Sequence, residues 1–236
     1  MEEREELARA LEFELNLGTK LSPRFSVEKA HAMQLELSKR IIRRDMLPKT
    51  VRLVAGVDIA YAKGLSIGAV AVLDFDSLSI VESRLVRLKT QFPYIPTLLS
   101  FREIPPAVST IRKLRVQPDV FLADGQGVAH PYRCGFASHL GLVLDKPTIG
   151  VAKSLLCGDV GSFDDRGWAP ITDDGEIIGA AVVTNPRQKP VYVSIGHRVS
   201  LKRAISVVAH CVKRDRIPEP IRMAHLLATE EKGKCL

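Results

Sequence analysis

The sequence has few cysteines, no long apolar run and no internal repeat, and each absence excludes a class of protein. Its four cysteines are scattered without a C-x-x-C pair, which argues against a zinc knuckle or a disulfide framework and favours free thiols. No apolar stretch reaches the ~20 residues that a membrane helix needs, and the acidic opening MEEREE lacks the basic-then-apolar order of a signal peptide. We therefore expect a cytoplasmic protein that does not enter a membrane.

Length, composition and charge are those of a globular protein. The 236 residues, 46% of them apolar, can fill one large core, and they exclude a mainly disordered chain. The 34 Lys and Arg residues exceed the 27 Asp and Glu residues, which gives a formal charge of +7. A basic protein is biased toward phosphate-rich partners, although charge alone does not identify one.

The first fifty residues differ in pattern from the rest. Apolar residues recur there at helical spacing behind a candidate N-cap at Ser26, which predicts helices that cover the body of the protein. These residues are Ala30, Met33, Leu37 and Ile41. The basic run in 39–52 fits a solvated helix face as well as a phosphate contact. We expect one domain, 1–236, with 1–50 as a helical arm and 51–236 as the core.

The core is predicted to be a sheet covered by helices. The apolar segments VRLVAGVDIA, SIGAVAVLDF and LSIVESRLVRL are separated by turn residues, which predicts an antiparallel meander. Strands then alternate with helix-like stretches, which predicts parallel pairing, and two later strands flank a hairpin at Asn185-Pro186. The predicted fold is therefore α/β, with a mixed sheet in which parallel strands follow the meander and helices lie on both faces.

Three acidic residues occur where acids are unfavourable. Asp58 ends the apolar run VAGVD, Asp124 ends FLAD, and Glu103 is predicted at the start of the helix between them. Two carboxylates at the ends of central strands repel each other, and a hard divalent cation such as Mg²⁺ would relieve that repulsion. A simpler interpretation stays open: strand-end aspartates can face solvent, and an acid in a first helical turn compensates the helix dipole.

Small and polar residues follow at the same predicted edge of the sheet. Gly125 and Gly127 occupy the turn after Asp124, where a ligand can approach the backbone, or where the chain simply turns tightly. The third glycine of a dinucleotide fingerprint and the glycine-rich loop of a nucleotide-binding site are both absent from the sequence. His130 opens the next helix and Lys153 ends a strand; each can contact phosphate or face solvent.

A stiff loop is predicted around Tyr94. Pro93 and Pro96 flank Tyr94 and Ile95, so the loop carries an aromatic and an aliphatic tip on a backbone with little freedom. Such a tip can enter a base stack at a small entropic cost. The alternative, in which Tyr94 and Ile95 pack inward, agrees equally well with these residues.

Several motifs occur along the chain in a fixed order. They are VAGVDIAY, PYIP, SFREIP, LADGQGVAHP, GFASHLGLVLDKPTIGVAKSLL and PEPIRMAH, and they span most of the chain from about Val51. Together they resemble those of endonuclease V, the repair nuclease for deaminated adenine. The resemblance implies a ribonuclease-H-like fold, a divalent cation, and hydrolysis of the second phosphodiester bond on the 3′ side of deoxyinosine. We expect Mg²⁺ as the cofactor, with Mn²⁺ as a substitute. The implied products carry 3′-hydroxyl and 5′-phosphate ends.

The resemblance also implies catalytic roles. Asp58 and Asp124 match the metal carboxylates of the family, and Glu103 matches its third essential acid. Lys153 matches a lysine near the scissile phosphate, and His225 a residue beside the metal, where some relatives carry an acid. Glu103 is expected to join Asp58, Asp124 and His225 at the metal. The mechanism that we expect is in-line attack by a water molecule that Glu103 orients or deprotonates, directly or through a second ion, while Lys153 offsets charge on the phosphate.

The substrate-binding residues implied by the resemblance lie in the stiff loop and after Asp124. They are Pro93, Tyr94, Ile95, Pro96, Gly125, Gly127 and His130. Tyr94 matches the wedge that fills the gap left when the lesion base rotates out of the duplex, and the two glycines match the backbone that closes on that base. Tyr132 departs from the arginine that the resemblance implies after His-Pro, at a position of an expected phosphate contact.

The expected partner is inosine-containing DNA, single- or double-stranded, and the expected enzyme is a monomer. One alternative is a nuclease of the same fold that acts mainly on inosine in RNA. Another is a catalytically silent protein that binds nucleic acid through its basic surface and wedge. The intact acidic trio argues against this last alternative.

Overall fold

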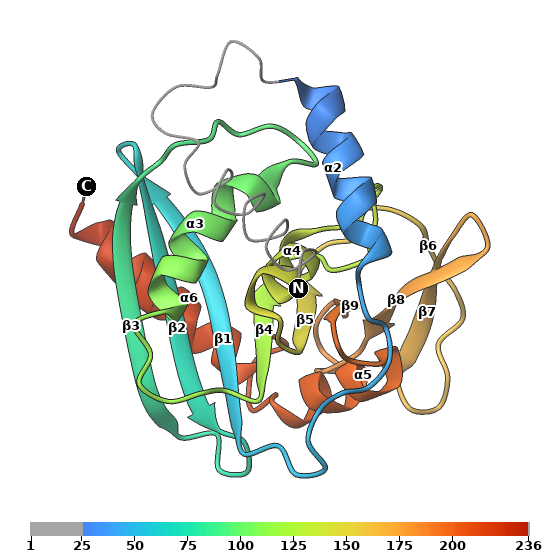
Figure 1. The fold of residues 1–236 in the computed structure, drawn as a ribbon. Coiled ribbons are helices and arrows are strands. Elements are labelled where there is room, and N and C mark those ends of the chain that lie inside the picture. Colours follow the sequence, from blue (N-terminus) through green and yellow to red (C-terminus); the bar gives the residue numbers. More distant parts are fainter. Residues whose placement is uncertain (1–25, 236) are drawn as a thin grey trace.

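A mixed nine-stranded sheet forms the centre of the part of the chain that the computed structural model describes, residues 26–235 (Figure 1). The strand order is β3-β2-β1-β4-β5-β9-β8-β7-β6. The strands are β1 (Leu53–Ala62), β2 (Leu65–Asp74), β3 (Ile80–Lys89), β4 (Val120–Asp124), β5 (Thr148–Ala152), β6 (Asp159–Val160), β7 (Trp168–Asp173), β8 (Glu176–Val182) and β9 (Val191–His197). The helices are α2 (Val27–Lys39), α3 (Leu99–Ile111), α4 (Phe136–Leu144), α5 (Leu201–His210) and α6 (Glu219–Gly233).

The first half of the sheet has the predicted topology. β1 pairs antiparallel with β2, and β2 with β3. The turn between β1 and β2 is Lys63-Gly64, whose φ angles are 44° and 77°, and a two-residue turn of this kind fits the twist of the strands. β4 then pairs parallel with β1, and β5 parallel with β4. The prediction of parallel strands after a meander is therefore confirmed.

The second half of the sheet is antiparallel. β9 pairs with β5 and with β8, and the hairpin predicted at Asn185-Pro186 connects β8 to β9. β7 and β6 extend the sheet beyond β8. Neither strand is predicted from the sequence, because β6 has two residues and shows no period, and Pro170 interrupts the apolar pattern of β7.

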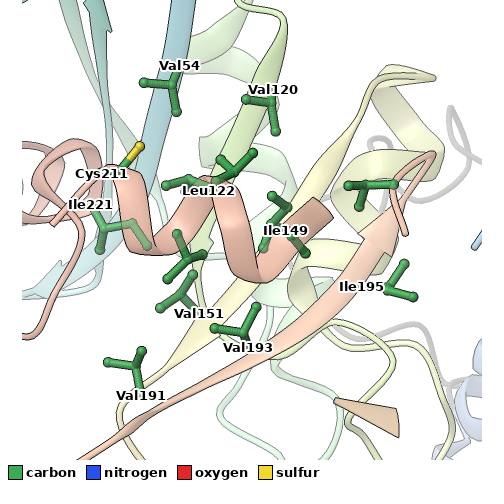
Figure 2. Packing of buried hydrophobic residues seen from close by; sticks show 14 of the residues in the cluster. Val54, Val120, Leu122, Ile149, Val151, Val191, Val193, Ile195, Cys211 and Ile221 are labelled. Carbon is green, nitrogen blue, oxygen red and sulfur yellow. The ribbon is translucent and has the colours of Figure 1, made fainter. Parts of the chain in front are cut away.

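Both faces of the central strands are buried, as their continuous apolar runs predicted. On one face, Val54 and Leu122 pack in a cluster with Ile221 of α6, and Figure 2 shows this packing. On the other face, Val57 packs in a cluster with Ile104 of α3. The two helices therefore cover opposite faces of the sheet, α3 in front of the meander and α6 behind it in Figure 1.

Two glycines set how closely these helices approach the sheet. A Cβ atom on Gly56 of β1 would lie 2.0 Å from the Pro220 carbonyl group, at the start of α6. A Cβ atom on Gly68 of β2 would lie 2.5 Å from the carbonyl oxygen of Pro106 in α3. Because no side chain lies between strand and helix, the backbone of each helix contacts the backbone of the strand. This contact fixes the distance of the helix from the sheet and with it the positions of the side chains on the helix.

Helix α3 begins earlier than the sequence indicated. The Pro105-Pro106 pair is typical of a helix start, which placed Glu103 in the first turn, but the helix begins at Leu99 and Glu103 lies in its second turn. Leu98 is fully buried in a small cluster with Phe92 and Ala30, and this packing stabilises the additional turn. Dipole compensation at a helix start therefore does not explain Glu103.

The N-terminal arm is helical over residues 27–39. Ser26 caps α2 as predicted, with its hydroxyl accepting a hydrogen bond from the Lys29 N–H at 3.2 Å. Residues 40–52 contain no helix, and the Arg198 N–H donates to the Ile42 carbonyl in this segment at 2.7 Å. Residues 1–25 of the predicted arm lie outside the described part of the chain. No helix in the described part is long and apolar enough to span a membrane.

Candidate active site

Two aspartates and a histidine meet at the carboxyl end of the parallel strands. The β1–β4 register pairs Val57 with Ala123, so the next residues, Asp58 and Asp124, are neighbours at this edge. His225 reaches them from α6, with Nδ1 2.8 Å from the Asp58 Oδ2 atom. One ligand atom from each of Asp58, Asp124 and His225 lies within 4.8 Å of the other two. From the sequence, Asp58, Asp124 and Glu103 are expected to converge on one ion, with His225 beside it; the structure brings the two aspartates together with His225.

Glu103 reaches the site from the opposite face of the sheet. Its side chain is buried on α3, and burial, followed by the negative charges of Asp58 and Asp124, raises the pKa of Glu103 well above its usual value. The adjacent Arg102 guanidinium opposes this shift. Glu103 is not among the three clustered ligand residues, but it shares their electrostatic field. Its carboxyl group therefore holds a proton more readily than an exposed glutamate does.

Lys153 forms an ion pair with Asp124. Its Nζ atom lies 2.6 Å from the Asp124 Oδ2 atom, directly after β5. Burial and the charge of Asp58 raise the pKa of Asp124, and Lys153 acts in the opposite direction. The Lys153 side chain is 43% exposed, so the ammonium group can also reach a substrate outside the protein. The sequence prediction of a lysine at the same sheet edge as the aspartates is confirmed.

This donor set suits a divalent cation. Carboxylate oxygens are the ligands that Mg²⁺ and Mn²⁺ prefer, and imidazole is a good ligand for Mn²⁺ and other transition metals. Burial and mutual repulsion raise the pKa values of Asp124 and Glu103, which means that their ionised forms lack sufficient compensating charge. A bound cation would supply that charge and favour the ionised carboxylates. The donor atoms of these residues are therefore chemically suited to bind a divalent metal ion.

Tyr61 and Arg102 also belong to this site, although neither is predicted as a site residue from the sequence. The Arg102 guanidinium lies 4.0 Å from the centroid of the Tyr61 ring. Burial and the charge of Glu103 raise the pKa of Tyr61, so its phenol stays protonated. Arg102 is adjacent to Glu103, and Tyr61 ends the strand motif VAGVDIAY. That adjacency was the available signal, since side chains next to a catalytic acid in sequence often share its surroundings.

The glycines after Asp124 have different surroundings. A Cβ atom on Gly127 would lie 2.1 Å from the carbonyl oxygen of Ile195 in β9, so the group that approaches Gly127 closely is the protein backbone. Its N–H donates to the Ser194 hydroxyl at 2.8 Å. A Cβ atom on Gly125 would meet only the Phe136 side chain, at an ordinary 3.5 Å. Gly127 therefore has a packing reason for being glycine, and Gly125 is the more open of the two.

His130 is buried and uncharged at neutral pH. Its exposed fraction is 4%, and its Nδ1 atom accepts a hydrogen bond from the Tyr132 N–H at 3.2 Å. Burial lowers the pKa of His130 to about 4, and the nearby charges of His31 and Arg133 act in the same direction. The ring also hydrogen-bonds the Thr97 backbone. A phosphate contact by this residue would therefore involve its neutral ring.

Substitution of His130 is expected to change how stability depends on pH. The unfolded chain takes up a proton below pH 6.5, whereas folded His130 does so only near pH 4, so stability is lost as the pH falls between these values. We expect the free energy of unfolding to fall by about 3 kcal/mol more in wild type than in His130→Gln over this pH range. Urea unfolding at pH 7.5 and pH 4 measures the difference. Burial also lowers the pKa of His197, but that contribution is common to both proteins and cancels. Equal losses would show that His130 is not held neutral.

The proline-flanked loop presents Tyr94 to solvent. Tyr94 is 68% exposed, the largest exposed fraction among the large hydrophobic side chains of the described residues. Pro93 and Pro96 are also exposed, whereas Ile95 packs against the cluster that contains Phe92. The prediction of an exposed tip therefore holds for Tyr94, which points outward. The alternative of inward packing holds for Ile95.

Comparison with known proteins identifies the family. Residues 35–226 match the family model of endonuclease V. The endonuclease V of Thermofilum pendens is 47% identical over 89% of this chain and 90% of its own length. The crystal structure of endonuclease V from Streptomyces avermitilis superposes with a TM-score of 0.81 at 37% identity, covering 89% of this chain and 94% of that one.

A further structure was solved with a nucleic acid. Ciona intestinalis endonuclease V, in complex with a 24mer DNA containing an inosine followed by a ribo-adenosine, is 33% identical with a TM-score of 0.78. The two chains cover 88% of this protein and 98% of that one. These likenesses confirm the ribonuclease-H-like fold inferred from the sequence. The chain therefore belongs to the endonuclease V family, the metal-dependent nucleases of DNA repair.

Proposed function

We propose that this protein hydrolyses the second phosphodiester bond on the 3′ side of a deoxyinosine in DNA, leaving 3′-hydroxyl and 5′-phosphate ends. The observation that carries the proposal is the convergence of Asp58, Asp124 and His225, with Glu103 in the same electrostatic field. The inosine-containing DNA bound by the Ciona relative supports the choice of lesion. We further propose a monomeric cytoplasmic enzyme with Mg²⁺ as its natural ion and Mn²⁺ as a substitute.

Each side chain of the site has a role in this chemistry. Asp58, Asp124 and His225 would hold the cation, which when bound polarises the phosphate and acidifies a water molecule. Glu103 orients the attacking water and accepts its proton, a task for which a raised pKa is suited. Lys153 extends from Asp124 and donates to an oxygen of the phosphate as negative charge accumulates there. No covalent enzyme intermediate is needed.

Recognition of the lesion is assigned to the exposed loop and the turn after Asp124. Tyr94 would enter the base stack at the position that the rotated nucleotide leaves. Its exposure and the two flanking prolines support this role, because a stiff loop loses little entropy when it inserts. The backbone at Gly125, which has space above it, would close on the extruded base.

Replacement of Tyr94 by alanine is expected to weaken binding of an inosine duplex by about tenfold or more, because base stacking on an aromatic ring is lost. Fluorescence anisotropy with a labelled duplex measures this affinity, and 2-aminopurine beside the lesion reports on base extrusion. Titration calorimetry with Mn²⁺ is expected to give unchanged metal binding. Phe163→Ala, which truncates another exposed aromatic residue, is the matched control. Unchanged affinity together with an unchanged 2-aminopurine signal in Tyr94→Ala would remove the wedge role.

A strand-resolved nicking assay tests the proposed reaction as a whole. The substrate is a duplex with one inosine, incubated with and without Mg²⁺, and the cut is mapped to the nucleotide. Matched DNA and RNA strands in the same assay distinguish the proposed enzyme from an inosine-specific ribonuclease of the same fold. Binding without magnesium-dependent cutting would identify a catalytically silent protein instead.

A further inference from the structure

We propose that helix α2 holds the wedge loop in place, with His31 and Gln34 as positioning residues that act on Thr97. This inference rests on the proposed wedge role of Tyr94. It assigns a function to the N-terminal arm, for which the sequence motifs implied none.

Thr97 is the point at which the loop is fixed. It has a φ of 69°, a left-handed conformation that a β-branched residue adopts only when its surroundings enforce it. The His31 Nε2 atom lies 2.8 Å from the Thr97 hydroxyl, and Gln34 Nε2 donates to the Thr97 carbonyl at 2.9 Å. The Thr97 hydroxyl itself donates to the Pro96 carbonyl, so it accepts from His31. Two side chains of α2 thus hold the backbone three residues after Tyr94.

Gln34 also connects the loop to the lesion side of the site. Its side chain is fully buried, and the same Nε2 group donates a second hydrogen bond to the Cys134 carbonyl at 3.0 Å. Both amide hydrogens are therefore used, one on each segment. Because Cys134 follows the turn that begins at His130, a single amide fixes the distance between the wedge loop and the segment after Gly127.

An aromatic stack supports the same arrangement. The His31 ring lies 3.9 Å from the Tyr132 ring, with an interplanar angle of 14°. Tyr132 is the residue that replaces the arginine expected after His-Pro, so in this chain the position is used to hold α2. The His130 ring hydrogen-bonds the Thr97 backbone as well. Contacts from α2 and from the 130–134 segment therefore meet at Thr97.

The consequence for binding is preorganisation. Phe92 and Leu98 anchor the two ends of the loop in a buried cluster, which leaves only the segment between them to carry Tyr94. Without the Gln34 and His31 contacts, the strained conformation of Thr97 would relax and Tyr94 would sample more orientations. Ordering the ring on the duplex would then cost additional entropy, which appears as weaker binding of the lesion.

A double-mutant cycle tests the proposal. Gln34→Leu removes both donated hydrogen bonds at similar volume, and it is made in wild type and in Tyr94→Ala. We expect Gln34→Leu to weaken inosine-duplex binding about fivefold in wild type and by less than about twofold in Tyr94→Ala, because it acts through the Tyr94 ring. His31→Phe, which keeps the stack on Tyr132 and loses the bond to Thr97, is the second variant and carries the test if Gln34→Leu does not fold.

The control and the outcomes separate the two proposals. Ser38→Ala removes a hydrogen bond to the Leu35 carbonyl on the same helix and is expected to bind as wild type does. Equal losses in the two backgrounds, or no loss in wild type from either variant, would overturn the positioning role while leaving the wedge intact. If Tyr94→Ala itself has no effect on binding, the wedge role fails, and the positioning role fails with it.

Discussion

Asp124→Asn is expected to lower magnesium-dependent nicking of an inosine duplex by about a thousandfold or more, and Asp58→Asn is expected to do the same. Asparagine keeps the shape of the side chain but removes the negative charge that holds a hard cation. Loss of the metal's contribution to charge stabilisation costs several kcal/mol of barrier, which corresponds to a rate factor of this size. Single-turnover nicking assays and Mn²⁺ titration calorimetry should show the loss of rate and of metal affinity together.

Asp124→Asn is expected to keep or gain stability although it loses activity. Burial and the charge of Asp58 raise the pKa of Asp124, so its ionised form is disfavoured in the folded protein without metal. Ionisation of Asp124 therefore lowers the free energy of unfolding as the pH rises above the ordinary pKa of an aspartate. A neutral asparagine does not ionise, so it removes this loss. In metal-free buffer at pH 7.5, we expect the variant to be at least as stable as wild type, as sites that bind charge often are after neutralisation.

Asp119→Asn is the control for this experiment. The Asp119 carboxylate accepts hydrogen bonds from the Arg52 and Leu53 N–H groups, at the opposite end of β1 and β4. Both hydrogen bonds end on one oxygen of the carboxylate, and the asparagine amide oxygen can accept both, so activity is expected to be unchanged. Near-wild-type nicking by Asp58→Asn or Asp124→Asn in magnesium would show that these carboxylates do not hold the catalytic ion.

The order of strands could be predicted because each element has a strong local signal. β1 and β2 have continuous apolar runs joined by Lys63-Gly64, and their burial on both faces follows directly from that pattern. The positions of Asp58 and Asp124 at one edge follow from parallel pairing of β1 with β4. Local pattern and global topology agree over this half of the molecule, which is why sequence reasoning succeeded there.

Other features depend on contacts between segments that are distant in sequence. His225 lies 167 residues from Asp58, and only the family resemblance, which implied a residue beside the metal, connected His225 with the aspartates. The early start of α3 depends on burial of Leu98 with Phe92 and Ala30. The neutral state of His130 depends on how deeply tertiary packing buries it. These features arise from tertiary packing, so they cannot be predicted from residue types and spacing within one segment.

Gly56→Ala is expected to lower the free energy of unfolding by about 3 kcal/mol or more and to reduce nicking as well. The new methyl group would lie 2.0 Å from the carbonyl carbon and oxygen of Pro220 and 2.4 Å from the Ile221 nitrogen. All three are backbone atoms, so no side-chain rotation relieves the clash and α6 must shift as a unit. His225 moves with α6, and its 2.8 Å contact with Asp58 lengthens. Urea unfolding and single-turnover nicking measure the two effects.

The comparison between Gly56→Ala and Gly233→Ala isolates the role of this contact. Gly233 is the last residue of the same helix, and a Cβ atom there has no neighbour within 4 Å. Alanine at that position is expected to be neutral or to stabilise by up to about 1 kcal/mol, since it only increases helix propensity. A Gly56→Ala variant as stable as wild type would mean that α6 does not lie in backbone contact with β1. Because Asp124→Asn removes activity without lowering stability, and Gly56→Ala lowers both, the pair distinguishes loss of a ligand from displacement of the helix that carries one.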